Sequence, residues 1–349
     1  MDQSKKVTVG IPVYNVEKYI ARCLFSVLNQ TYKNINILIT YDESHDNSLQ
    51  IVKDIFQDTE TEYKIIYKDP KDKGLGQSRN VILNNFDGDF LYFLDSDDFI
   101  EYDTIGLMVH EAIGSGSDIV AASHRMVNEN NEELGSISYP CHTQMSGEEL
   151  RDYIYLYNGQ YTNYAWNKLY KREFIQNSNL KFEENLMEDM LFDFFTHHHL
   201  QKISLMPNIT LNYLIRDSSI TQSQINKNMS HELAEFILYV KETKFDFNSG
   251  HSYQEFCSNI DAFVWSYIHI NRDALNSDII SPENKSALSK KSFVTPNIPI
   301  TSFPRLYKLK KNKFLIFLLI RVLSGWQNRM LINIYSIYRK FSKRLKPRI

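Results

Sequence analysis

The sequence is poor in cysteine and has no long hydrophobic run near its start. Its three cysteines, Cys23, Cys141 and Cys257, lie far apart and have no metal-ligand spacing. Such an odd, sparse set argues against a disulfide scaffold and is typical of a reducing compartment. The opening stretch MDQSKKVTVGIPVYN enters a strand pattern directly, without the apolar core of a signal peptide. These absences predict a cytoplasmic protein.

Acidic residues are absent from the C-terminal end of the sequence. Residues 284–349 hold 16 Lys or Arg and no Asp or Glu, which leaves the rest of the chain 23 basic against 42 acidic residues, a formal charge of −19. The longest apolar run of this tail, Phe314–Ile320, is far shorter than the roughly 20 residues that cross a bilayer. Apolar residues interleaved with Lys and Arg, with Trp326 among them, instead favour a helix in the headgroup layer.

We therefore expect the tail to hold a cytoplasmic protein reversibly on an anionic membrane surface, since each Lys or Arg near such a surface adds about 1 kcal/mol. Three other interpretations of the tail stay open: a nucleic-acid patch, a partner-binding helix pair, and helices packed on the body. Nucleic acid is not expected as a partner, because the acidic body would repel a phosphate backbone.

Apolar runs alternate with helical patterns through the first part of the sequence. The runs expected to form strands are KVTVGIPV, INILITYD, YKIIYK, FLYFLD and DIVAASHRMV. The first helix is expected after Asn15, a candidate N-cap, on an apolar stripe at i, i+3, i+4 and i+7. Strands separated by crossover-length helices predict an α/β fold, with a parallel-type sheet covered by helices on both faces. Ligands of such sheets bind at the carboxyl ends of the strands, where Asp42 and Asp95 lie.

The later part of the sequence follows other patterns. Residues 128–225 are less regular, and the pattern becomes helical from about residue 226. Residues 281–304 contain four prolines and are expected to form a connector rather than a helix.

Three carboxylates follow a strongly apolar run in FLYFLDSDDFI, residues 90–100. Asp95 and Asp97 stand two apart, so their side chains can share one face. Hard oxygen ligands on a single turn suit Mg²⁺ or Mn²⁺. The alternative is an Asp-rich turn that caps the next helix, a role for which Asp98 is equally suited.

Four motifs follow one another along the sequence in this order: VGIPVYNVEKYIARCLFSVLNQTY, KGLGQSRN, YFLDSDDFI and MEDMLF. Together they resemble the family-2 glycosyltransferases with the GT-A fold, over roughly residues 5–222. The resemblance implies a Rossmann-like mixed sheet with helices on both faces, followed by a C-terminal α-helical add-on. It divides the chain into a catalytic domain, residues 1–222, and a helical domain, residues 223–349. It also implies a UDP-sugar donor across the strand ends, with Mn²⁺ or Mg²⁺ on its diphosphate.

The resemblance assigns a set of residues to the donor. The implied donor-site residues are Pro12, Tyr14, Asn15, Asp42, Asp72, Gly74, Arg79, Asp95, Ser96 and Arg216. Asp42 would accept a hydrogen bond from the uracil ring, and Asp97, with Asp95, would coordinate the metal. The family usually has Asp-Asp-Gly-Ser where this chain has YDES, so Glu43 replaces the glycine of that turn. Arg216 would clamp the diphosphate, because a guanidinium binds phosphate with two hydrogen bonds.

The acceptor side is implied by the later motifs. An inverting transferase needs one carboxylate to deprotonate the acceptor hydroxyl, and the residue matching that base is Asp189. Its neighbour Glu188 would orient an acceptor hydroxyl or a main-chain group, although an acidic pair also suits the first turn of a helix. Trp166 is either a sugar-stacking platform or a buried core residue. Relatives often place a metal-binding His near Arg216, where this chain has none; Asp217 or water would fill that role.

Consecutive histidines occur at residues 197–199. Neighbouring positions on a helix point about 100° apart, so these three side chains are not expected to share one metal ion.

The resemblance therefore predicts an inverting, metal-dependent transfer of a hexose, galactose before glucose, to a saccharide acceptor on a glycoprotein or polysaccharide. Within the family, the chain is similar to streptococcal enzymes that modify adhesins or build capsules. One alternative is a nucleotidyltransferase that makes the nucleotide-sugar, although IPVYNVEKY lacks the glycine-rich loop of that chemistry. Another is a membrane-associated scaffold with a lapsed transferase domain, which the altered YDES run would suit.

Overall fold

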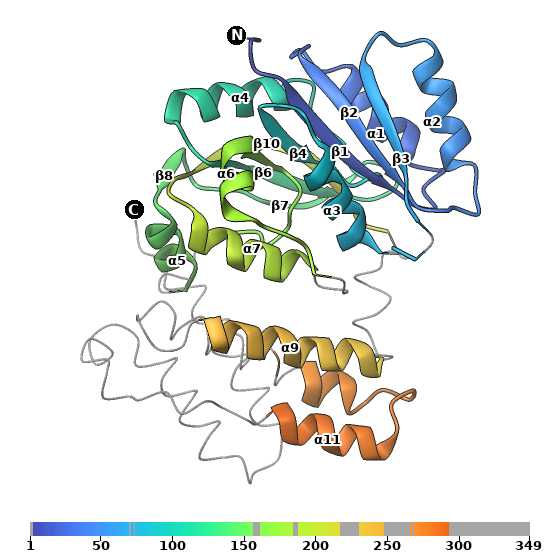
Figure 1. The fold of residues 1–349 in the computed structure, drawn as a ribbon, viewed down its shortest axis with the longest axis vertical. Coiled ribbons are helices and arrows are strands. Elements are labelled where there is room, and N and C mark those ends of the chain that lie inside the picture. The colour runs from blue at the N-terminus through green and yellow to red at the C-terminus, as the bar shows by residue number, and fades with distance from the viewer. Residues whose placement is uncertain are drawn as a thin grey trace. The chain divides into compact units, whose positions relative to one another are not determined.

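Within the described residues, ten strands form one mixed sheet in the computed structural model of the chain (Figure 1). The structure describes residues 3–69, 71–72, 74–155, 161–183, 188–216, 230–247, 266 and 269–292. The chain divides into two compact units, residues 1–150 with 160–216, and residues 151–159 with 217–349. The basic tail after residue 292 and Cys257 lie outside the described residues, and so does the boundary expected at residue 222.

The strands of the first unit run in the order β3-β2-β1-β4-β9-β6-β10-β5, with β7 beside β6 and β8 beside β10. Their bounds are β1 Val7–Val13, β2 Ile35–Tyr41, β3 Glu62–Tyr67, β4 Phe90–Phe93, β5 Phe99–Ile100, β6 Ile119–Val127, β7 Glu133–Ile137, β8 Thr143–Met145, β9 Lys168–Lys171 and β10 Ile203–Leu214. Strands β1 to β4 pair in parallel, whereas β9 is antiparallel to both β4 and β6. The predicted mixed α/β sheet is confirmed.

Helices cover both faces of this sheet. The helices of the first unit are α1 Ile20–Leu28, α2 Ser48–Gln57, α3 Leu75–Asn85, α4 Thr104–Ser115, α6 Arg172–Ser178 and α7 Glu188–His199, while α5 Gly147–Tyr155 spans the division between the units. Alternate residues of β1, such as Val9 and Ile11, join the buried cluster that includes residues of α1, α2 and α4. Gly10, on the other face, lies against Ile82 of α3 so closely that an added Cβ would be 2.5 Å from Ile82 Cγ2.

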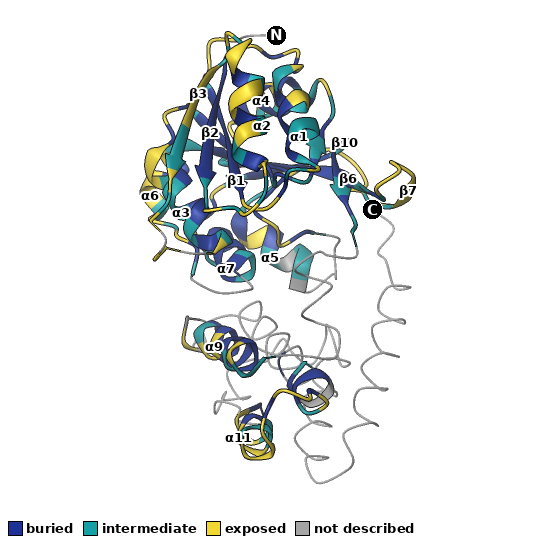
Figure 2. Ribbon diagram, turned by 90° about the vertical axis from the view of Figure 1, so that its right-hand side faces the viewer, coloured by how far each residue is buried: buried dark blue, intermediate teal, exposed yellow. Residues whose placement is uncertain are grey.

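Burial follows from this layering. Every residue of β1 is buried, because β1 lies in the parallel part of the sheet, where both faces are covered. The edge strand β3 is mostly exposed, in contrast to β1 and β2 beside it (Figure 2). The first helix keeps its predicted stripe of Ile20, Cys23, Leu24 and Val27, all buried.

Two local predictions are wrong. Helix α1 begins at Ile20, and Asn15 does not cap it; Asn15 instead takes a left-handed backbone conformation, with φ 50°, in the loop before the helix. Residues 281–304 were expected to form a connector, yet Pro282–Ser292 form helix α11. Proline is favourable at the first position of a helix, where its missing N–H has no partner to lose.

The second unit is helical where it is described. Its elements are α9 His231–Phe247, the π-helical turn η1 Ile270–Ala274 and α11 Pro282–Ser292. Lys241 of α9 donates to the carbonyl of Lys291 at 2.8 Å, which fastens α9 to α11. Among the described residues, no helix combines the length and the apolar character that a membrane crossing requires.

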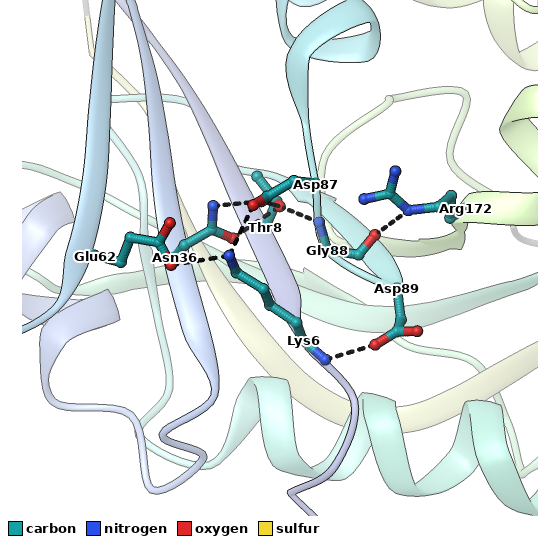
Figure 3. Close-up of polar contacts among 8 residues, drawn as sticks. All are labelled: Lys6, Thr8, Asn36, Glu62, Asp87, Gly88, Asp89 and Arg172. Atoms are coloured by element: carbon teal, nitrogen blue, oxygen red, sulfur yellow. Dashed lines mark hydrogen bonds and ion pairs between the residues drawn. The ribbon is translucent and has the colours of Figure 1, made fainter.

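A polar cluster fixes the amino-terminal edge of the sheet (Figure 3). The carboxylate of Asp87 accepts from Asn36 Nδ2 at 2.7 Å and from Lys6 Nζ at 2.8 Å, and Thr8 donates to the Asn36 side chain at 2.8 Å. Nearby, Arg172 donates to the Gly88 carbonyl at 2.6 Å. This cluster joins β1, β2 and the turn before β4 at the edge opposite the strand ends that carry the candidate site.

Candidate active site

The parallel register brings the predicted residues to one edge of the sheet. Val13 pairs with Tyr41 and Tyr41 with Tyr67, so the loops after β1, β2 and β3 leave the sheet side by side. Gly10 pairs with Phe93, which places the aspartates after β4 beside the same loops. The residues predicted to form the site therefore gather at the carboxyl ends of the strands, where ligands of such sheets bind.

The aspartates after β4 have different environments. The side chains of Asp95 and Asp97 are 22% and 21% exposed. Asp98 is buried, and its Oδ1 accepts from the Leu214 backbone N–H of β10 at 2.8 Å. Burial and the charges of Asp97 and Asp95 raise the pKa of Asp98 well above its ordinary value. Asp98 thus ties the turn to β10, and it does not cap α4, which begins at Thr104.

Arg79 of α3 joins both predicted parts of the site. Its Nη1 donates to Glu188 Oε1 at 2.8 Å and to Asp189 Oδ1 at 2.7 Å, and its Nη2 donates to Asp95 Oδ1 at 2.8 Å. Burial lowers the pKa of Arg79, but the surrounding carboxylates outweigh burial and raise it. The guanidinium therefore stays charged and holds the strand-end aspartate and the start of α7 in one cluster.

The close approach of α3 to the α7 segment depends on Gly76. A Cβ at this position would lie 2.7 Å from the Glu183 carbonyl oxygen and 3.3 Å from Glu188 Cβ. A side chain here would push the two segments apart, and with them Arg79 from Glu188.

The predicted base, Asp189, lies in the first turn of α7 with its side chain 16% exposed. Burial raises the pKa of Asp189 to about 7; the charge of Arg79 opposes this rise, whereas Glu188 and Asp95 add to it. The Ala165 backbone N–H near its carboxylate lowers this pKa in part. A carboxylate with a pKa near neutrality can both hold and accept a proton, as general base catalysis requires.

Arg216 lies at the end of β10 beside the aspartates. Its Nη2 is 2.8 Å from Asp97 Oδ2, and its guanidinium lies over the Tyr19 ring, 5.0 Å from the centroid. The residue expected to clamp a diphosphate thus contacts the residue expected to bind the metal.

The pair Asp95 and Asp97 fits the implied divalent metal. Burial and the charge of Asp95 raise the pKa of Asp97, although Arg216 lies against it. Each carboxylate contacts one guanidinium, Arg79 at Asp95 and Arg216 at Asp97. Among the described residues, no group of three His, Cys, Asp or Glu side chains is placed to hold an ion. Mg²⁺ and similar ions are commonly held by one or two carboxylates, with water and substrate phosphates as the other ligands. Two partly exposed carboxylates match that pattern.

The loops after β1 and β2, where the resemblance places the nucleotide, are bonded to each other. Asn15 N–H donates to Ser44 Oγ at 3.1 Å, and His45 N–H donates to Asn15 Oδ1 at 2.9 Å. Glu43, which replaces the glycine of the family's turn, has no left-handed φ. The altered YDES run is therefore accommodated without backbone strain at Glu43.

Lys68 was missed by sequence reasoning. Its side chain is fully buried and donates to Asp42 Oδ2 at 3.0 Å, to the Gly74 carbonyl at 3.1 Å and to Ser78 Oγ at 2.9 Å. Lys68 thereby fixes the predicted base-contacting carboxylate to the N-terminus of α3. One sequence signal could have found it. Lys68 directly follows β3, as Asp42 directly follows β2, and these two strands are neighbours in the sheet.

The other predicted donor residues lie on the same edge with different exposure. Pro12 is buried in β1 and Ser96 is buried in the turn after β4, whereas Tyr14 and Asp72 are exposed. Gly74 caps α3 with φ 104°, a left-handed value that favours glycine.

Trp166 is buried, with 3% of its surface exposed. It stacks with Tyr164 at a centroid distance of 4.6 Å and with Tyr213 at 5.2 Å. The exposed member of this aromatic stack is Tyr164, a residue that the sequence analysis did not single out.

The three consecutive histidines lie in different surroundings. His197 is buried with its Nε2 2.9 Å from Asp193 Oδ2, His198 Nδ1 bonds the Phe194 carbonyl, and His199 is exposed. Asp193 also accepts from Lys168 at 2.6 Å, so His197 belongs to a buried polar cluster with Asp193 and Lys168.

Comparison with known proteins concerns the family and the fold of the chain. Residues 8–178 match the family model described as Glycosyl transferase family 2. The glycosyltransferase GlyA of Streptococcus pneumoniae is 30% identical over 227 residues, which are 62% of this chain and 32% of GlyA, so the match spans about a third of that protein. The putative glycosyltransferase EpsH of Bacillus subtilis is 30% identical over 268 residues, 75% of each chain.

Among solved structures, S. aureus TarS 1-349 in complex with UDP-GlcNAc superposes with a TM-score of 0.58 at 20% identity, covering 82% of this chain and 87% of that one. A likeness at this identity concerns the fold, and it agrees with the predicted GT-A arrangement of the sheet and its helices.

Proposed function

The chain belongs to glycosyl transferase family 2, and we propose that it moves a hexose from a UDP-sugar to a saccharide acceptor, with inversion at the anomeric carbon. The observation that carries this proposal is the Arg79 cluster. Arg79 holds Asp95, on the expected donor side, and Asp189, the expected base, within hydrogen-bond distance of one guanidinium. The donor-side carboxylate and the base would thus be held next to each other by the Arg79 guanidinium.

The proposed reaction uses Asp189 as the general base. The acceptor hydroxyl gives its proton to the Asp189 carboxylate, its oxygen forms a bond to C1 of the donor sugar, and the bond from C1 to the diphosphate breaks. UDP leaves with that electron pair, and attack from the face opposite UDP inverts C1. Arg79 keeps Asp189 in place, and Arg216 binds phosphate oxygens as UDP leaves.

Asp95 and Asp97 would hold the divalent metal, for which we favour Mn²⁺ over Mg²⁺. A bound cation offsets the charge that develops on the leaving diphosphate. For the donor we favour UDP-galactose, then UDP-glucose, and for the acceptor a saccharide on a glycoprotein or polysaccharide. The TarS complex with UDP-GlcNAc supports a uridine nucleotide as the donor class.

A donor screen tests this function. UDP release should be fastest with UDP-galactose, should require Mn²⁺ or Mg²⁺, and should be lost in Asp97→Ala and Asp189→Ala. Asp54→Ala is the matched control, because Asp54 is an exposed acid on α2. Turnover that survives both active-site substitutions would refute the assignment.

We also propose that the basic tail holds this enzyme on the inner face of the cell membrane. Its support is the excess of Lys and Arg without any acidic residue across residues 284–349. The boundary between catalytic and helical domains near residue 222 stays a prediction as well.

A further inference from the structure

Tyr164 is an exposed aromatic residue that lies close in sequence to a backbone neighbour of the predicted base, Asp189. It is 37% exposed, its ring lies 6.3 Å from that of Tyr213 of β10, and it immediately precedes Ala165, whose backbone N–H near the Asp189 carboxylate lowers the pKa of that group. Burial raises the pKa of Tyr164, and the charge of Asp189 raises it further. The Tyr164 ring therefore lies within the electrostatic reach of the base.

The ring of Tyr164 rests on a rigid foundation. Trp166 stacks with it at 4.6 Å with the ring planes 11° apart, and Tyr213 of β10 stacks with Trp166 at 5.2 Å. The ring of His124, from β6, meets Trp166 edge-on at 4.9 Å. Of these rings Tyr164 is the most exposed, Tyr213 is half-buried and Trp166 is buried.

The backbone under the stack is also fixed. Asn167 takes a left-handed conformation with φ 56°, and its Nδ2 donates to the Ala122 carbonyl at 2.8 Å. Its Oδ1 accepts from Thr210 at 2.8 Å and from Tyr92 at 3.1 Å. Because three strands hold Asn167, the segment that carries Tyr164 is positioned before any substrate arrives.

We propose that Tyr164, rather than the buried Trp166, is the platform on which the acceptor sugar stacks. The negative face of an aromatic ring attracts the C–H groups on the apolar face of a pyranose. A pyranose on the exposed surface of Tyr164 would direct a ring hydroxyl toward Asp189. The acceptor class is then a pyranose unit with an apolar C–H face. This inference rests on the proposed glycosyl transfer.

Kinetics of the full chain test the platform, with methyl β-D-galactopyranoside and methyl β-D-glucopyranoside as probe acceptors. Tyr164→Ala should raise the KM for the probe by about tenfold, which corresponds to about 1.4 kcal/mol of binding. Release of UDP to water, without a probe, should change by less than about twofold, because the donor site is intact. Tyr164→Phe should behave as the wild type, because the ring face and not the hydroxyl makes the contact.

The matched control is Tyr63→Ala. Tyr63 is also an exposed tyrosine with one stacked partner, Phe56 at 4.0 Å, but it lies at the amino-terminal end of β3. An unchanged KM in Tyr164→Ala, or an equal loss in Tyr164→Phe, would overturn the proposal. If UDP release without a probe fell in Tyr164→Ala as much as the activity toward the probe, the proposal would be overturned too, because that result would indicate a structural role.

Saturation-transfer NMR gives a result that does not depend on turnover. Irradiating the aromatic protons of the protein should saturate the C–H protons of the probe in the wild type and in Tyr164→Phe, but not in Tyr164→Ala. Absence of transfer in the wild type would overturn the platform. Failure of the proposed function would show differently, as no UDP release from any UDP-sugar.

Discussion

Arg79 Nη1 lies 2.7 Å from Asp189 Oδ1, although 110 positions separate the two residues in the sequence. The same nitrogen also donates to Glu188, and both contacts are protected from water because Arg79 is 1% exposed. The donors of a guanidinium have a fixed planar geometry, so a buried arginine fixes the positions of two carboxylates more closely than a lysine ammonium could. The orientation of the predicted base is therefore set by a residue on another helix.

Replacing Arg79 by Lys should keep the charge but lose the shared contacts. We expect kcat to fall by roughly a hundredfold, because small misplacements of a catalytic group can cost that much. The measurement is UDP release at saturating donor. Arg172→Lys is the control, since Arg172 bonds the Gly88 carbonyl at the amino-terminal edge (Figure 3). Equal activity of both variants would contradict the role of Arg79.

The pH profile should report the raised pKa of Asp189. A base must be deprotonated to work, so kcat/KM should fall as the pH drops below about 7. Glu188→Gln removes a like charge that raises this pKa and should shift the acidic limb to lower pH. A limb that stays in place in Glu188→Gln would show that another group controls it.

Asp98 should be replaceable by an uncharged isostere. Its raised pKa means that folding disfavours the ionised form, so Asp98→Asn should stabilise the protein at neutral pH. This advantage over the wild type should shrink as the pH falls, because the wild-type carboxyl then gains its proton. Asp98→Ala should instead lose about 1–3 kcal/mol, because the Leu214 N–H loses its acceptor. Thermal melts across pH distinguish these outcomes.

Lys68 should matter for donor binding. Lys68→Met removes the cation that fixes Asp42 and should weaken binding of UDP by roughly tenfold, about the value of one charge-assisted hydrogen bond. Calorimetric titration with UDP measures this change. Lys64→Met, an exposed lysine of the same strand, is the control and should bind normally. Unaltered affinity in Lys68→Met would remove Lys68 from the nucleotide site.

The basic tail should bind anionic vesicles. Full-length protein should sediment with vesicles containing phosphatidylglycerol but not with phosphatidylcholine alone, and high salt should release it. Removing residues 305–349 should abolish this sedimentation. A full-length chain that stays in the supernatant with both vesicle types would disprove membrane attachment.

Much of the fold followed from local sequence patterns. The alternation of apolar strands and amphipathic helices predicted an α/β sheet covered on both faces, because side-chain periodicity reports which faces are buried. That the sheet is mixed was implied only by the family resemblance. Helix ends were less predictable: Asn15 suits an N-cap, but its bond with His45 N–H holds it in a loop. Residues 282–292 form a helix because a proline at its first position does not break it.

The sequence by itself determined the sheet class, the family and the set of polar residues gathered at the strand ends. These features depend on periodicity and on motifs whose residues are close neighbours in the chain. Only the tertiary structure decided that Arg79 joins Asp95 to Asp189, that Lys68 holds Asp42, and that Tyr164 is exposed while Trp166 is buried. The reason is physical: such contacts depend on side-chain packing between distant segments, which no local pattern encodes.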